Sequence, residues 1–248
     1  MDCEQINPYT GDTRTKSQQV KEMFDNIAPA YDFMNRAMTF GIDRLWRRKA
    51  IKMLSRNHPT SILDVATGTG DLAILLARKT DASKITGIDL SEGMIEIGRK
   101  KIKQAALDNK ITLCQGDCLN LPMPDATFDA VTVAYGVRNF ENLLAGYREM
   151  LRVIRPGGSI TVIELATPVS PLVRPLYRLY TRWIIPALGR MVSKDVRAYS
   201  YLPESIAAVA QRDSMTSLMT KAGFTDTKWR SLTFGTCIIY TARRPEND

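Results

Sequence analysis

The stretch that most constrains the fold is residues 62–73, which read Ile-Leu-Asp-Val-Ala-Thr-Gly-Thr-Gly-Asp-Leu-Ala. The first four residues are too few for a helix and precede a glycine turn, so they predict a buried parallel strand. Gly68 and Gly70 allow the backbone to turn tightly and to approach a ligand closely. The apolar run that follows predicts a helix, whose first N–H groups point at the turn. Strand, glycine turn and helix in this order predict a nucleotide-type cofactor site in a doubly wound sheet.

The charges around this turn indicate which cofactor binds there. Asp71 lies at the helix N-terminus, where a dinucleotide would place its pyrophosphate, and a carboxylate at that point repels phosphate. S-adenosylmethionine carries a sulfonium cation and an amino group in place of phosphates, so Asp64 and Asp71 suit it. We therefore expect S-adenosylmethionine as the cofactor, with Gly68, Thr69 and Gly70 in contact with it.

Two more aspartates follow apolar runs that predict the next two strands. Asp89 follows residues 85–88 and suits the two ribose hydroxyls of the cofactor. Asp117 follows residues 111–114, and together with the N–H of Cys118 it suits the adenine edge. A simple role as a helix or turn cap is the alternative for each aspartate taken alone.

The composition excludes several classes of protein. With 248 residues and 44% apolar residues, the chain is long enough for one core with an appendage. No apolar run approaches the ~18–20 residues needed to span a bilayer, and the N-terminus lacks an apolar signal segment. The four cysteines are scattered without a CxxC pair, which predicts neither a metal site nor a disulfide framework and favours a reducing cytoplasm. The single histidine, His58, lies in a predicted loop, which argues against a histidine-based catalytic triad.

The net charge of +8 is concentrated in two segments outside the predicted cofactor core. Residues 36–56 hold seven Lys or Arg and one acid, and residues 167–200 hold six Lys or Arg and one acid. A solvated charged face is one interpretation. A docking surface for phosphate groups, on lipid or nucleic acid, is the other.

The N-terminal segment, residues 17–56, predicts two helices that cap the sheet. Apolar residues recur at helical spacing in both parts: Val20, Met23, Phe24 and Ile27, then Leu45, Trp46, Ile51 and Leu54. We expect Pro29 to end the first helix. Tyr31 and Asp32 would then lie in a break between the helices, where polar groups can face a cofactor pocket.

The segment from residue 60 to residue 165 alternates apolar runs with helical stretches. Strands are expected at 62–65, 85–88, 111–114, 130–134 and 159–164, and helices at 71–78, 94–107 and 143–154, with a turn at 155–158. Residues 213–243 add a helix and a strand pair. The prediction is an α/β fold in one domain spanning 1–248. Its seven-stranded, mostly parallel, Rossmann-like sheet carries helices on both faces.

Residues 167–212 interrupt the alternation and form a helical insertion after the fifth strand. One side of a helix here would be apolar: Leu172, Leu176, Leu179, Trp183 and Leu188. Arg174, Arg178 and Arg182 recur every four residues and form a basic stripe, and Pro186 ends or kinks the helix. Such a helix either lies on an anionic membrane surface or packs on its own domain, and the sequence favours neither.

Three motifs, 64–71 (Asp-Val-Ala-Thr-Gly-Thr-Gly-Asp), 87–91 (Gly-Ile-Asp-Leu-Ser) and 151–158 (Leu-Arg-Val-Ile-Arg-Pro-Gly-Gly), resemble those of class I S-adenosylmethionine-dependent methyltransferases. Narrower motifs at 24–32, 135–139 and 199–205 resemble the ubiquinone/menaquinone biosynthesis C-methyltransferase family. The resemblance covers nearly the whole chain. It implies C-methylation of a polyprenylated quinol, demethylmenaquinol in many bacteria, with a ubiquinone precursor as the alternative. It also implies a cytoplasmic enzyme that meets its substrate at the membrane surface.

Methyl transfer to a ring carbon needs an electron-rich ring, alignment with the donor methyl group and removal of a phenolic proton. Arg138 follows the fourth predicted strand and is our candidate for stabilising the phenolate. It is a poor base, because its pKa exceeds ~12. Structural pairing with Glu141 or Glu164 is the alternative for Arg138. The candidate bases, which the sequence does not rank, are Asp195, Asp32 and Tyr199.

Two other classes of function stay open. The isoelectric point of 9.4 fits an RNA methyltransferase, but the chain lacks the amine-acceptor motifs and aromatic platforms typical of one, so we expect no nucleic acid partner. A non-catalytic adenosylmethionine-binding subunit is the second class. The sequence leaves open whether the chain forms a homo-oligomer.

Overall fold

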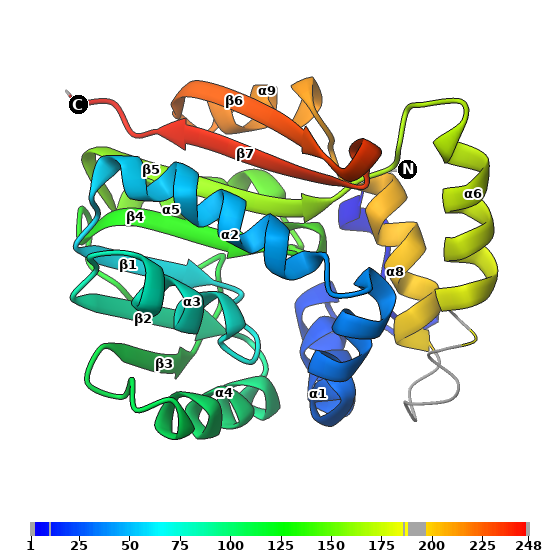
Figure 1. The fold of residues 1–248 in the computed structure, drawn as a ribbon, viewed down its shortest axis with the longest axis horizontal. Helices are drawn as coiled ribbons and strands as arrows, with labels where there is room; N and C mark the ends of the chain where they lie inside the picture. The colour runs from blue at the N-terminus through cyan, green and yellow to red at the C-terminus, as the bar shows by residue number, and fades with distance from the viewer. Residues whose placement is uncertain (1–2, 10, 186, 188–196, 247–248) are drawn as a thin grey trace.

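The computed structural model describes residues 3–9, 11–185, 187 and 197–246. Seven strands of this part form one sheet in the order β3-β2-β1-β4-β5-β7-β6 (Figure 1). Their bounds are β1 Ser61–Val65, β2 Lys84–Asp89, β3 Ile111–Gln115, β4 Phe128–Ala134, β5 Ile154–Leu165, β6 Thr225–Leu232 and β7 Cys237–Arg243. Only β7 is antiparallel to its neighbours. The predicted Rossmann-like α/β fold is confirmed.

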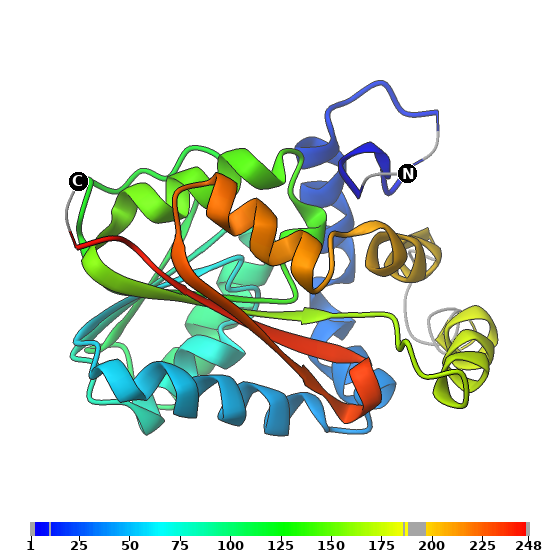
Figure 2. The same ribbon diagram turned by 90° about the horizontal axis from the view of Figure 1, so that it is seen from above.

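Helices cover both faces of the sheet (Figure 2). One face carries α2 (Asp43–Leu54), α3 (Asp71–Lys79) and α4 (Glu92–Gln104), and the other carries α5 (Leu143–Val153) and α9 (Asp213–Lys221). Each helix buries its apolar stripe in one of two large cores, which lie on opposite sides of the buried central strands. Because both faces are covered, the central strands are almost entirely apolar, as parallel strands require.

The remaining helices pack beyond the carboxyl ends of the strands (Figure 1). They are α1 (Lys16–Thr39), α8 (Arg197–Ala208) and α6 (Val173–Leu179), the last continued by a π-helical turn at Tyr180–Ile184. Short 3-10 helices lie at Cys3–Gln5, Ser55–Asn57, Val137–Asn139 and Thr233–Gly235. This cap and insertion enclose the edge of the sheet where a doubly wound fold binds ligands.

The expected break at Pro29 is wrong, because α1 continues through it to Thr39. Proline inside a helix costs about 3 kcal/mol. Apolar side chains on both sides of Pro29, Met23 and Ile27 before it and Met34 after it, are buried in one cluster with residues of α8. Burial of such side chains contributes about 1.5–3 kcal/mol each, which outweighs the proline penalty. Tertiary packing therefore decides the length of this helix.

The expected turn at 155–158 is also wrong in form. The structure assigns these residues to β5, which begins at Ile154 directly after α5. The register between β4 and β5 shifts at this point. Phe128 of β4 pairs with Ile154 of β5, and Ala130 pairs with Ser159. The extra residues form a bulge, in which Gly157 has a φ of +74° and donates its N–H to Arg244 O at 3.1 Å. A backbone hydrogen bond to Arg244, near the end of the chain, thus takes the place of the isolated turn that we expected at 155–158.

The first part of the insertion after β5, residues 169–184, exposes several large apolar side chains. Leu172 is 83% exposed, and Leu176, Leu179 and Trp183 are also exposed. Leu188 and Pro186 lie outside the described residues. Within the described residues no helix is long and apolar enough to span a membrane.

Candidate active site

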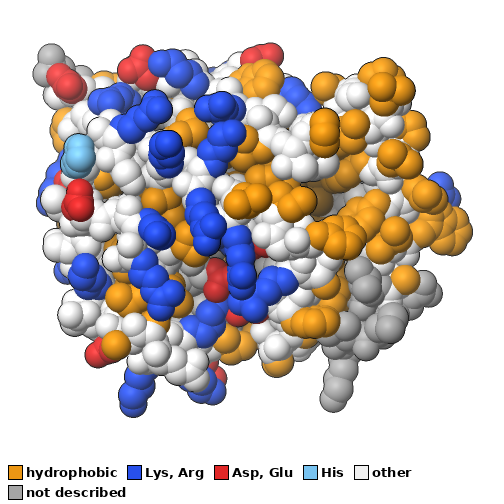
Figure 3. All heavy atoms as spheres, viewed as in Figure 1, with side chains coloured by type: hydrophobic (Ala, Val, Ile, Leu, Met, Phe, Trp, Pro, Cys, Tyr) orange, Lys and Arg blue, Asp and Glu red, His pale blue; other side chains and the backbone are white. Residues whose placement is uncertain are grey.

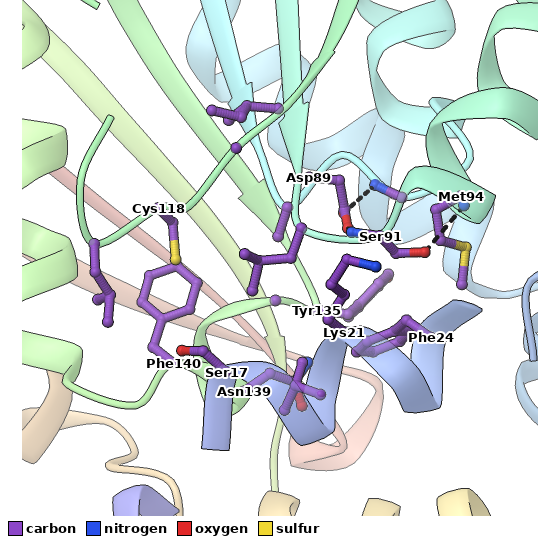
Figure 4. A pocket seen from close by; sticks show the side chains of 18 of the residues that line it. Ser17, Lys21, Phe24, Asp89, Ser91, Met94, Cys118, Tyr135, Asn139 and Phe140 are labelled. Carbon is purple, nitrogen blue, oxygen red and sulfur yellow. Dashed lines mark hydrogen bonds between the residues drawn. The ribbon is translucent and has the colours of Figure 1, made fainter. Parts of the chain in front are cut away.

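A pocket of about 680 Å³ opens beyond the carboxyl ends of β1, β2 and β4. The strand order reverses between β1 and β4, and the loops that follow these two strands diverge to form the pocket. Figure 4 shows Asp89, Ser91 and Met94 on one side of the pocket and Cys118 and Phe140 on the other.

Asp89, at the end of β2, lines this pocket. Its carboxylate accepts the N–H of Gly68 at 2.7 Å and the N–H of Ser91 at 3.0 Å, so its position is set by two loops. Burial raises the pKa of Asp89 above its usual range. Gly68 also lines the pocket and has a φ of +56°, which favours glycine. Both residues therefore lie where the sequence predicted them.

One wall of the pocket comes from α1. Ser17, Val20, Lys21, Phe24 and Tyr31 all line it. A Cβ added to Gly68 would lie 3.8 Å from Cε1 of Tyr31, so the tyrosine ring lies against the glycine loop. Of these residues, the sequence analysis had singled out only Tyr31 for the pocket. The helical spacing from Ser17 to Phe24, continued past Pro29, would have placed the others on the same face.

Thr69 and Gly70 do not line the pocket. Thr69 is buried, and its hydroxyl donates to Asp32 Oδ1 at 2.6 Å and accepts from Lys101 Nζ at 3.0 Å. Lys101 also pairs with Asp71. Asp32 is thus part of a network that joins α1, the glycine loop and α4, and it does not face the cofactor. Contact of Thr69 and Gly70 with a cofactor stays a prediction.

The acidic residues that were expected to suit a cationic cofactor have other partners. Asp64 is buried below the loop, where it accepts hydrogen bonds from Thr132 Oγ1 at 2.6 Å and Thr67 Oγ1 at 2.7 Å. Burial raises the pKa of Asp64 to about 6. Burial would also raise the pKa of Asp71, but the charge and hydrogen bond of Lys101, together with the charges of Arg47 and Arg36, outweigh burial, so the pKa is lowered. Neither residue lines the pocket, so our electrostatic argument for the cofactor from these two residues is wrong.

The loop after β3 contributes Gly116 and Cys118 to the pocket, but Asp117 between them is not among the lining residues. The Asp117 carboxylate accepts the N–H of Leu119 at 2.9 Å, which is a local turn contact. Cys118 is buried, which raises the pKa of its thiol well above the usual value. Cys118 thus lines the pocket in which the adenine was expected to bind. The contact of Asp117 with adenine stays a prediction.

A second, larger cavity of about 960 Å³ adjoins the first. Its walls come from α1, α2, α6, α8 and the ends of β4 and β5, and most of them are apolar or aromatic. Tyr135, directly after β4, lines both cavities. It has a φ of +61°, a strained region for a residue other than glycine. Gly136 follows it because a Cβ there would lie 2.6 Å from the Cβ of Ala66.

Arg138 lines the second cavity and is only 6% exposed. Its Nη1 donates to Glu164 Oε1 at 2.8 Å and to the carbonyl oxygen of Tyr135. The pairing with Glu164 that we held as the alternative is therefore present. Its Nε is buried and has no hydrogen-bond partner. Arg138 is thus an ion-paired residue that still has an unused donor.

Arg47 lies at the same cavity and is also 6% exposed, although it belongs to the basic segment 36–56. It pairs with Asp43 one turn earlier on α2, and its guanidinium carbon lies 5.2 Å from the ring centroid of Tyr135. Its Nε and the hydroxyl of Tyr135 are both buried without a partner. The sequence analysis missed Arg47, because its neighbours in the chain suggest an exposed basic face.

The other two catalytic candidates lie apart from the cofactor pocket or outside the described residues. Tyr199 is buried and lines a smaller cavity together with Arg138, Asn139 and Tyr201. The hydroxyl of Tyr201 donates to Asn139 Oδ1 at 3.2 Å. Asp195 lies outside the described residues. No cluster of metal-ligating side chains occurs among the residues that the structure describes.

The residues of the first pocket fit S-adenosylmethionine. Asp89 offers a carboxylate to ribose hydroxyls, Gly68 leaves the loop open to close approach, and Val20, Phe24 and Tyr31 of α1 add apolar and aromatic surface beside the polar Ser17 and Lys21. Chemically, such a pocket beside a second cavity with buried donors suits group transfer between a nucleoside cofactor and an aromatic substrate.

Comparison with known proteins agrees with this geometry. The sequence profile of the ubiE/COQ5 methyltransferase family matches residues 12–244. Demethylmenaquinone methyltransferase of Bacteroides fragilis is 47% identical over 97% of this chain and 98% of its own. Ubiquinone/menaquinone biosynthesis C-methyltransferase of Geobacter sulfurreducens is 42% identical over 92% and 90%.

Among solved structures, an S-adenosylmethionine-dependent methyltransferase of Thermotoga maritima, a possible histamine N-methyltransferase, superposes with a TM-score of 0.64 at 19% identity. It covers 90% of this chain and 99% of its own, and at that identity the likeness supports the fold alone. The family resemblance expected from the sequence motifs is confirmed by the profile and the relatives. The chain belongs to the ubiE/COQ5 methyltransferase family and is therefore a methyltransferase.

Proposed function

We propose that this enzyme transfers a methyl group to the ring carbon of a polyprenylated demethylmenaquinol and so forms menaquinol. Relatives in two genera whose names specify demethylmenaquinone are 47% identical over nearly the whole chain. The observation that carries the proposal is the pair of adjoining cavities, which share Tyr135 as a common wall. One cavity has the carboxylate for a nucleoside, and the other is aromatic and apolar with buried donors.

S-adenosylmethionine, when bound in the first cavity, supplies an electrophilic methyl group. The residues of the chain prepare the acceptor ring for it. Arg138 would donate a hydrogen bond to the phenolate oxygen next to the acceptor carbon, through the Nε that has no partner. Glu164 holds the guanidinium in place at 2.8 Å. Because Arg138 is buried and held by Glu164, this fixed donor would stabilise developing negative charge more strongly than solvent does.

A base must take the phenolic proton, and the proton on the methylated ring carbon must then leave to restore the aromatic ring. Arg138 keeps its proton, because Glu164 stabilises the charged form. Asp32 is engaged by Lys101 and Thr69, which argues against it. Tyr199 and Asp195 stay candidates, and a water held by Arg138 and Asn139 is a third. Alignment of ring and donor contributes to the rate in each case.

The walls of the second cavity suit a prenyl tail. Phe40 lines the cavity and is 80% exposed, so it lies at the rim. The exposed leucines and Trp183 of the insertion continue this apolar surface, and Figure 3 shows hydrophobic side chains gathered over α6. We propose that this surface, together with the exposed Arg174, Arg178 and Arg182, rests on an anionic membrane, from which the quinol enters the cavity.

The test of the proposed reaction is a comparison of quinones in cells that hold or lack the gene. Cells without the protein should accumulate a menaquinone precursor whose ring is lighter by one methylene group, detected by mass spectrometry. Purified enzyme with labelled S-adenosylmethionine should transfer the label to the ring of a demethylmenaquinol. Normal menaquinone in the deletion strain would contradict the proposal.

A ubiquinone precursor is the second candidate, because relatives that are 40–42% identical carry names that include both pathways. Both candidate substrates are dihydroxylated rings with a prenyl tail. The same mass measurement separates them, since the deficit would appear in ubiquinone.

A further inference from the structure

The second cavity has two buried arginines, and only Arg138 has a role in the reaction proposed above. Arg47 and Arg138 are each 6% exposed, each is paired with a carboxylate, and each keeps a buried Nε–H that has no hydrogen-bond partner. The Tyr135 hydroxyl at the same cavity is also buried and unpartnered. Leaving a buried donor unsatisfied costs about 1–3 kcal/mol, so three of them at one cavity indicate a ligand that satisfies them.

Both arginines contact the same residue. The Arg47 guanidinium carbon lies over the Tyr135 ring, at 5.2 Å from its centroid, and Arg138 donates to the Tyr135 backbone carbonyl. The two guanidinium groups therefore contact different parts of Tyr135, and most of the other residues that line the cavity are apolar or aromatic. A ring that carries oxygen atoms on two opposite positions matches this arrangement.

We propose that Arg47 is a second oxygen-binding residue, which receives the hydroxyl of the quinol ring opposite the one held by Arg138. This inference rests on the proposed function and adds a specificity determinant to it. Asp43 and the Tyr135 ring hold the Arg47 side chain, and Trp46 packs edge-on against the same ring. The site then selects a ring with two opposite oxygens over a monophenol, because a monophenol leaves the Arg47 donor buried and unpaired.

Arg47→Lys is the most informative variant. Lysine keeps the positive charge that pairs with Asp43 but lacks the Nε–H of the planar guanidinium. Arg48→Lys is the matched control, since Arg48 is the next residue of α2 and is exposed. Both variants are assayed with two short-tailed soluble acceptors: a naphthohydroquinone, and a naphthol that lacks only the hydroxyl opposite the one next to the acceptor carbon.

The wild type should prefer the hydroquinone in kcat/KM by about 10- to 100-fold, the ratio that corresponds to one hydrogen bond to a charged group. Arg47→Lys should lose most of this preference by slowing the hydroquinone reaction alone, and Arg48→Lys should keep it. Equal loss on both acceptors, or no preference in the wild type, would overturn the role of Arg47. Failure of the wild type to methylate either acceptor would instead contradict the proposed function.

A second substitution tests the same oxygen site in case Arg47→Lys fails to fold. Tyr135→Phe removes only the unpartnered hydroxyl and leaves the ring beneath Arg47. If the Tyr135 hydroxyl shares the second oxygen with Arg47, this variant should lower the preference for the hydroquinone, as measured by kcat/KM on the two acceptors. An unchanged preference together with an unfolded Arg47→Lys would count against the proposal.

Discussion

Lys101 Nζ on α4 lies 2.7 Å from Asp32 Oδ2 on α1, and the same ammonium pairs with Asp71 at the start of α3. The contact joins three helices around the glycine loop, and Thr69 of that loop completes the network. All three charged side chains are partly buried. The N-terminal helix that walls the cofactor pocket is thereby tied to the nucleotide-binding core.

Lys101→Met should loosen this connection, because it leaves the carboxylates of Asp32 and Asp71 together without a cation. The expected loss of stability is about 1–3 kcal/mol, between the values for exposed and buried pairs. The charge and hydrogen bond of Lys101 help to lower the pKa of Asp71, so the stabilisation is present above the unfolded pKa and is lost as pH falls through the lower folded-state pKa. Chemical denaturation at a series of pH values from 7 down to 2 measures the difference in stability between wild type and variant. A difference that does not shrink over this range would contradict this explanation.

Asp89→Ala should weaken the binding of S-adenosylmethionine, because the ribose hydroxyls lose a charged acceptor. The expected loss is about 1.5–3 kcal/mol, or roughly 10- to 150-fold in Kd. Asp108→Ala, an exposed aspartate beyond α4, is the control. Calorimetry on folded protein gives the Kd, and unchanged affinity in Asp89→Ala would refute the assignment.

Replacing Arg138 alone would leave the buried Glu164 carboxylate without its countercharge, although the Leu165 N–H still donates to it at 2.8 Å, and such a loss costs about 3–5 kcal/mol. The double variant Arg138→Gln/Glu164→Gln removes both charges at once and avoids this cost. We expect turnover on a quinol to fall by about 10²–10³-fold, as when one donor to a developing oxyanion is removed. Affinity for S-adenosylmethionine should change little, since Arg138 lines the other cavity. Quinol turnover near the wild-type rate would rule out the phenolate-stabilising role.

Asp64→Asn should reveal how much the buried, ionised carboxylate lowers the free energy of unfolding. The folded-state pKa of Asp64 is about 6, against about 4 for an unfolded chain, so the folded protein binds the proton more tightly. Ionisation therefore destabilises the wild type as pH rises from about 4 to about 6, by about 3 kcal/mol at most. The stability of the wild type relative to Asp64→Asn should fall over this interval and level off above it. A relative stability that does not change with pH would show that Asp64 titrates normally.

Arg174→Glu/Arg178→Glu/Arg182→Glu should weaken binding to anionic vesicles. Each basic residue near such a surface contributes about 1 kcal/mol, and the glutamates add repulsion. The apparent KM for vesicle-borne quinol should rise, while activity on a short-tailed soluble acceptor should survive. Vesicle sedimentation at low and high salt measures binding, which should decrease with salt in the wild type. Equal binding of the variant and the wild type would exclude this helix as the docking surface.

The order of strands and helices, and the edge of the sheet at which the first pocket lies, could be predicted from the local pattern of apolar residues and glycines. Residues 62–65, 85–88 and 111–114 were recognised as strands, because a buried parallel strand is a short apolar run whatever it packs against. Asp89 and Gly68 were predicted at the pocket for a related reason. The residue at the carboxyl end of a parallel strand faces the ligand edge in every doubly wound sheet.

Which charged side chains pair with one another depends on the three-dimensional packing and could not be predicted from local spacing. Arg138 pairs with Glu164 across neighbouring strands, and Arg47 is buried under a loop that follows β4. Local spacing cannot report such contacts, because a basic residue in a basic segment has the same neighbours in the chain whether it is exposed or buried. Packing against α8 likewise keeps α1 helical beyond Pro29, where local propensity alone would have ended the helix. The sequence thus located the cofactor pocket, and the three-dimensional packing of the cap and insertion produced the second cavity beside it.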